Sequence, residues 1–124
     1  MAHATTTGQH AQTTTKPQMP AFSTSTAMNL IWQKASRYMH PHELEWLASG
    51  ATEHIALMAD SLAEMLSGLG SLIGADESGS LQQTAELPHL LFNLSYQLDE
   101  ISGLAVIADD AGHLAMQALK GAKS

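Results

Sequence analysis

Two histidines and two glutamates lie close together in the run His-Pro-His-Glu-Leu-Glu, at His40, His42, Glu43 and Glu45. Imidazole nitrogens and carboxylate oxygens are ligands of zinc and other divalent ions, and the spacing of His42 and Glu45 places them on one face of a helix. A closed site needs further ligands from a distant position such as His113, and the sequence has no His-Glu-x-x-His motif. We therefore interpret the run as a helix start with surface histidines, and we expect no metal and no cofactor.

Catalytic chemistry finds little support elsewhere in the chain. His54, His89 and His113 stand alone, without a neighbouring residue that suggests general-base chemistry. Cysteine is absent, which removes thiol nucleophiles, thiolate metal sites and disulfides. A helical hairpin, the architecture predicted below, offers few concave pockets. We expect the protein not to be an enzyme.

The elements that would position these residues are helices. Pro41 disfavours helical geometry in the residue before it and suits the first turn of a new helix, so one helix is predicted from about Ser25 to His40 and a second from Pro41. Apolar residues of the second helix recur at spacings of three and four, a heptad pattern with one stutter that is typical of a coiled coil. They are Leu44, Leu47, Ala51, Ile55, Met58, Leu62, Met65, Leu69 and Leu72. Gly50 is a point where this helix could break.

A third helix is predicted after a turn at Gly74 to Gly79, with Pro88 favouring a start near Thr84. Its apolar seam is Leu87, Leu91, Leu94, Leu98, Ile101, Ala105, Ala108, Gly112, Ala115 and Leu119, bulky in its first half and small in its second. Two helices of about 30 residues joined by a short loop must run antiparallel. The predicted fold is all-α: a hairpin of two long helices plus a shorter N-terminal helix, like a three-helix bundle, over residues 25–120.

Residues 1–24 differ from the rest of the chain. They are rich in threonine and contain few large apolar residues, so we predict a disordered arm. The first residues lack the basic and apolar segments of a signal or transit peptide. Asn93, Asp99 and Glu100 interrupt the apolar stretch around them, so no transmembrane span is predicted there. We therefore expect a cytoplasmic protein with no membrane partner.

Acidic residues dominate the predicted helical domain. All twelve lie between Glu43 and Asp110, and no lysine or arginine occurs between Arg37 and Lys120. Nucleic-acid-binding proteins need clustered cations, so we expect no direct nucleic-acid binding. An alternative function is that of an acidic inhibitor, of the mobile-element or anti-defence type, that blocks a nucleic-acid-binding machine.

The predicted helices carry more apolar side chains than one hairpin can bury. This surplus predicts a non-enzymatic interaction or adaptor protein, with a protein partner or a second copy of the chain covering the remainder. Large aromatic and aliphatic anchors dominate protein interfaces. The candidate contact residues are Trp32, Tyr38, Trp46, Phe92, Leu104 and Ile107.

One short motif suggests a further alternative. Tyr96-Gln-Leu-Asp-Glu100 is similar in spacing to the Tyr-x-x-x-Asp/Glu motif of the WXG-type secreted proteins, which are also small acidic helical hairpins. The match covers five residues in mid-helix, and the sequence has Gly74-Ala-Asp-Glu-Ser-Gly79 where that family has a Trp-x-Gly turn. We do not assign the chain to the family on this motif. The resemblance implies an exported helical-hairpin secretion substrate as an alternative function.

Overall fold

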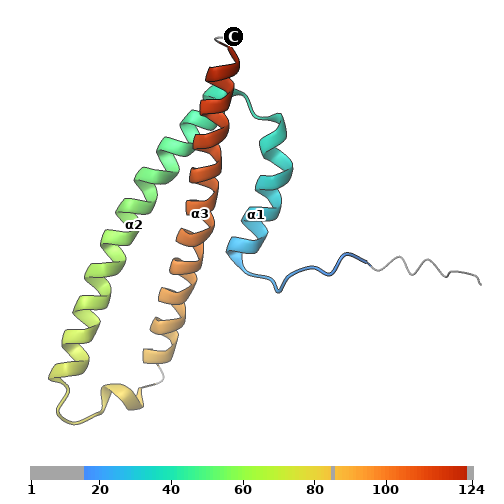
Figure 1. Ribbon diagram of the computed structural model, residues 1–124. Helices are drawn as coiled ribbons and strands as arrows, with labels where there is room; N and C mark the ends of the chain where they lie inside the picture. Colours follow the sequence, from blue (N-terminus) through green and yellow to red (C-terminus); the bar gives the residue numbers. More distant parts are fainter. Residues whose placement is uncertain (1–15, 85, 123–124) are drawn as a thin grey trace, which may run out of the picture.

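Two long antiparallel helices form the body of the molecule (Figure 1). The computed structural model describes residues 16–84 and 86–122. Helix α2 runs from Pro41 to Ala75 and helix α3 from Glu86 to Ala122. At 1.5 Å per residue each is about 50 Å long. The predicted all-α hairpin is confirmed, and the described part of the chain contains no strand.

The sequence marks the start of α2 clearly. Pro41 occupies the first turn, and the backbone N–H of His40 donates a hydrogen bond to Oε2 of Glu43 at 2.8 Å. This contact satisfies a helix-end donor and places a carboxylate near the positive end of the helix dipole. The helix then continues through Gly50 without the break that glycine could have caused.

Helix α1, Thr24–Ala35, lies beside α3 and is followed by a 3₁₀ turn, η1, at Ser36–Tyr38 (Figure 1). Its N-cap is Ser23, whose Oγ accepts a hydrogen bond from the Thr26 backbone N–H at 3.2 Å. The helix therefore begins slightly before the predicted Ser25. The four residues from Ser23 to Thr26 are all serine or threonine, which are favoured at helix N-caps, so residue type alone does not identify the cap.

The connection from α2 to α3 is a structured loop. The Asp76 carboxylate accepts hydrogen bonds from the Leu81 backbone N–H at 2.8 Å and from the Ser78 hydroxyl at 2.9 Å. These bonds, led by the one from Leu81, lower the pKa of Asp76 below its ordinary value. Gly79 has φ +68°, a conformation that favours glycine, and a short 3₁₀ turn, η2, spans Leu81–Gln83. Helix α3 begins close to the predicted start.

The core lies at the end of the hairpin that bears α1. It joins Trp32 of α1, Leu44 of α2, and Ile107, Ala111 and Ala115 of α3. The two alanines leave room for the bulky side chains of the other two helices. In the antiparallel hairpin the small second half of α3 thus lies against Leu44 at the start of α2, whereas Trp46 faces outward.

The buried side of α3 differs from the predicted seam. Leu94, Ala108 and Ala115 of that seam are buried, but Leu91, Leu98 and Ala105 are exposed. Gly103, Ile107 and Ala111, which lay off the seam, are buried instead. The reason is α1, which packs on one side of α3 and turns the opposite side toward solvent.

Helix α2 has an unusually apolar and exposed stretch. By length and composition it is the one helix in the described part of the chain that could cross a membrane, with a mean hydropathy of 1.2 over a stretch that is 11% buried. The second half of α2 also carries Asp60 and Glu64. A carboxylate at the centre of a bilayer costs about 2.5–3.5 kcal/mol. The absence of a membrane partner stays a prediction.

The predicted arm, residues 1–24, is described only in part. Residues 1–15 lie outside the described residues, and residues 16–22 form no helix. Thr24 already belongs to α1.

Candidate interaction surface

Helix α1 is held against α3 at its first turn. The Ser25 backbone N–H and hydroxyl donate hydrogen bonds to the two carboxylate oxygens of Asp99, at 3.0 and 2.7 Å. Asp99 therefore acts as an acceptor at the N-terminus of a neighbouring helix, where orphan N–H groups and the helix dipole favour negative charge. The bonds from the Ser25 side chain and then its backbone lower the pKa of Asp99 below its ordinary value.

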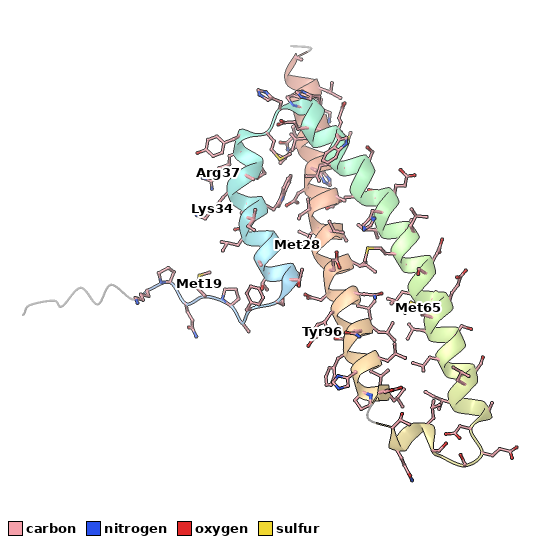
Figure 2. All side chains as sticks on the ribbon, turned by 180° about the vertical axis from the view of Figure 1, so that it is seen from behind. Met19, Met28, Lys34, Arg37, Met65 and Tyr96 are labelled. Atoms are coloured by element: carbon pink, nitrogen blue, oxygen red, sulfur yellow. The ribbon has the colours of Figure 1, made fainter. Side chains whose placement is uncertain are left out.

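A close approach of the two backbones accompanies this contact. A Cβ atom built on Gly103 would lie 2.9 Å from the Ser25 Cα and 3.3 Å from the Met28 Sδ. Glycine is therefore required at position 103 for α1 to lie this near to α3. Figure 2 shows Met28 on the side of α1 that faces α3, and Lys34 and Arg37 on the outer side of α1.

The far end of α1 is fixed by Trp32. Its indole Nε1–H donates a hydrogen bond to Oδ2 of Asp110 at 3.1 Å while the ring is buried in the core. Two of the acids in the anionic domain, Asp99 and Asp110, are thus engaged within the molecule. They do not present fully free carboxylates to a basic partner.

The six candidate contact residues do not gather on one surface. Trp32 and Ile107 lie in the core, and Leu104 is half-buried. Tyr38, Trp46 and Phe92 are exposed, with exposed fractions of 84%, 74% and 59%. Trp46 and Phe92 lie near opposite ends of the hairpin, about 30 Å apart at the rise of a helix.

The histidine and glutamate run forms the predicted helix start. The rings of His40 and His42 stack with their centroids 5.7 Å apart. His113 lies on α3, where its Nδ1 is 2.8 Å from the backbone oxygen of Asp109 and 3.7 Å from its Oδ1. Among residues 16–84 and 86–122, no three potential ligands are close enough to hold a metal ion. The expectation of no metal stays a prediction.

A shallow groove of about 750 Å³ runs between α2 and α3. The groove lies on the opposite side of α3 from α1. Residues two apart on a helix point in nearly opposite directions, and two such pairs divide between the groove and α1. Ala105 and Gly112 line the groove, whereas Gly103 and Asp110 contact α1. The full lining is Glu45, Ala48, Ser49, Thr52, Ala105, Ala108, Asp109, Gly112, His113, Ala115, Met116 and Leu119.

The groove continues toward the loop as an uncharged strip. On α3 the heptad positions before Ala105 are Leu98 and Leu91, both exposed. On α2 the corresponding exposed positions after Thr52 are Ala56, Ala59, Ala63 and Leu66. We call the groove and this strip the open face. The strip is bulky on α3, at Leu91 and Leu98, and mostly small on α2, whereas both helices line the groove with mainly small residues. Sequence periodicity had identified the row with Leu91 and Leu98 but assigned it to the interior of the hairpin.

Charged residues lie at only one end of the open face, within the described part of the chain. Glu45 and Asp109 line the groove near the start of α2, and no acidic residue occupies the strip that continues from it. The acids of the middle of α2, Glu53, Asp60 and Glu64, fall outside that strip. In a protein with a net charge of −7, the open face is therefore distinctly apolar.

Comparisons with protein families, with curated proteins and with solved structures give no match to this chain.

Proposed function

We propose that this chain is a non-enzymatic helical interaction protein that binds another protein chain through the open face. The observation that carries the proposal is its surface area. The molecule exposes 10008 Å². A compact folded protein of the same mass exposes about 6,400 Å², so the excess is about 3,600 Å².

The excess is not explained by the residues that precede α1. Residues 1–22, counted at the value for an unfolded chain, account for about 3,400 Å², and a compact body of the remaining mass exposes about 5,600 Å², which together leave about 1,000 Å². A standard protein interface buries about 800 Å² on each partner. The area left over is therefore of the size that a stable protein partner covers.

The open face has the composition of such an interface. Leu91, Leu98 and Met116 are large, apolar and exposed, and they lie in one row on α3. Contiguous apolar surface of this kind is typical of protein-binding sites, whereas scattered exposed leucines are normal on any protein. Tyr38, Trp46 and Phe92 are exposed as well, but they lie outside the open face.

The inhibitor alternative gains less support. Neutralising Asp99 or Asp110 would disturb the docking of α1, because Asp99 accepts hydrogen bonds from Ser25 and Asp110 accepts one from Trp32. The remaining acids are spread over two long helices, much more sparsely than the phosphates of duplex DNA. No contact in the described structure favours the inhibitor or the exported substrate over an interaction protein.

Site-specific photocrosslinking in cells tests the proposal. A benzophenone amino acid replaces Leu98 or Met116 on the open face, and in a matched control it replaces Glu53, which is exposed but lies off that face. We expect discrete adducts from the two open-face positions and none from Glu53. Equal labelling at all three positions, or no protein adduct from Leu98 and Met116, contradicts the proposal.

A further inference from the structure

We infer that the occupant of the open face is a second copy of this chain, and that two hairpins pack face to face into a four-helix bundle with α1 on the outside. This inference rests on the proposed function and names its partner. It starts from the strip of the open face, in which the α3 row is bulky at Leu91 and Leu98 and the α2 row is small at Ala56, Ala59 and Ala63. A face with both rows is complementary to itself.

The symmetry follows from these two rows. A two-fold axis parallel to the helices places α3 of one protomer over α2 of its partner, so that bulky side chains meet small ones. An axis perpendicular to the helices would place α3 over α3, and with Leu98 near the axis it would set leucine against leucine. In both arrangements every neighbouring pair of helices is antiparallel, with side chains of one helix fitting between those of the next.

The register within one hairpin predicts which residues meet. A Cβ on Gly112 would lie 4.0 Å from the Cβ of Ala48, so these two positions share a level. A step of about four turns leads from Gly112 back to Leu98 on α3. Because the helices are antiparallel, a step of the same length leads from Ala48 forward to residue 62 on α2, so Leu98 and residue 62 are level. Ala63 is the exposed small residue of the open face next to that level. In the two-fold pair, Leu98 of each protomer therefore packs on Ala63 of its partner.

The area is sufficient for a stable pair. The excess of about 1,000 Å² per chain would bury about 2,000 Å² in total, at the upper end of standard protein interfaces and the lower end of obligate dimers. The chain therefore has enough uncovered surface for a stable dimer without an additional partner.

Sedimentation equilibrium of the full-length protein tests the pairing. We expect a mass of twice 13.2 kDa for the unaltered chain. The variant Leu98→Arg places a charge in the middle of the interface and weakens the dimer about 100-fold or more. The matched control Leu57→Arg makes the same change on an exposed leucine of α2 outside the open face, and it stays dimeric. Both variants keep the helical circular-dichroism signal, since each leucine is more than half exposed in one chain.

Engineered cysteines test the axis, because the natural chain has none. Mixing Leu98→Cys chains with Ala63→Cys chains under mild oxidation gives a cross-linked heterodimer, since a disulfide requires Cα atoms about 4.4–6.8 Å apart. Rapid cross-linking of Leu98→Cys chains with each other would overturn the pairing of α3 on α2.

The outcomes separate this inference from the proposed function. A purified chain that stays monomeric, combined with photocrosslinks from Leu98 to a different protein, overturns the second copy and supports the proposed function. A monomer with no photocrosslinks overturns both. A dimer that resists Leu98→Arg but dissociates with Leu57→Arg overturns the assignment of the open face.

Discussion

Asp99 is an acidic residue whose carboxylate makes a structural contact within the molecule. From sequence it belonged to an anionic surface and preceded Glu100, the acid of the Tyr-x-x-x-Asp/Glu spacing that begins at Tyr96. In the structure its carboxylate binds the first turn of α1 through Ser25. The partner is 74 residues away in the chain. Local patterns do not report contacts at that separation, and so the role of Asp99 was not predictable from the sequence.

The docking of α1 is expected to depend on pH through Asp99. Its pKa is lowered in the folded protein, so the ionised form stabilises docking above the ordinary carboxyl pKa of about 3.9, and this stabilisation is lost as the pH falls through the lowered value. A carboxyl-carbon NMR titration is expected to give a midpoint for Asp99 below the ordinary value. Ser25→Ala removes the largest cause of the shift and raises that midpoint. An unchanged midpoint in Ser25→Ala would show that the contact with Ser25 does not form in solution.

The six candidate contact residues illustrate a limit of reasoning from residue type. Trp32 and Tyr38 are both large aromatic residues of the same segment, yet one is in the core and the other is exposed. Trp32 is buried because its helix lies on α3 and its indole N–H finds Asp110. Size and aromaticity indicate that a side chain needs a contact, but they do not distinguish an internal contact from an external one.

At the scale of the elements, helix limits could be predicted better than helix faces. Pro41 and Pro88 each constrain a helix start through the geometry of one residue, and α2 and α3 begin where these prolines indicate. The face of α3 was harder, because apolar residues lie nearly all round it. Heptad spacing identified the row with Leu91 and Leu98, but α1 selects a different side for burial.

Gly103 is the position where the arrangement of α1 on α3 is most sensitive. In Gly103→Ala the added methyl would approach the Ser25 backbone to 2.9 Å, so α1 must shift. Overpacking of this kind costs about 1–3 kcal/mol, more than the gain of about 1 kcal/mol from replacing a glycine within a helix. Urea unfolding monitored by tryptophan fluorescence is expected to show a lower stability.

Gly50→Ala is the matched control for that substitution. Gly50 is also in mid-helix, but nothing lies within 4 Å of a Cβ built there. Replacement is expected to stabilise the protein by about 0.5–1 kcal/mol through helix propensity alone. Equal effects of the two substitutions would contradict the close approach of α1 to α3.

At the scale of the whole molecule, one face carries few charged side chains. The strip of the open face beyond the groove carries no acid, Glu45 and Asp109 line the groove, and Lys34 and Arg37 lie on the outer side of α1. A net charge of −7 opposes nonspecific association between copies, and the uncharged strip is where the proposed contact would form. The sequence predicted a surplus of apolar side chains but not which of them form the open face, since that depends on which side of α3 receives α1.

Methyl NMR with a soluble paramagnetic probe tests most directly whether the open face is covered by another chain. Leu98 and Leu57 have similar exposed fractions in a single chain, 51% and 64%, and they differ in lying on and off the open face. We predict that, in the full-length protein at concentrations where it is dimeric, the Leu98 methyl signals are protected from the probe while the Leu57 signals are strongly attenuated. Strong attenuation of both residues to a similar degree would contradict the account.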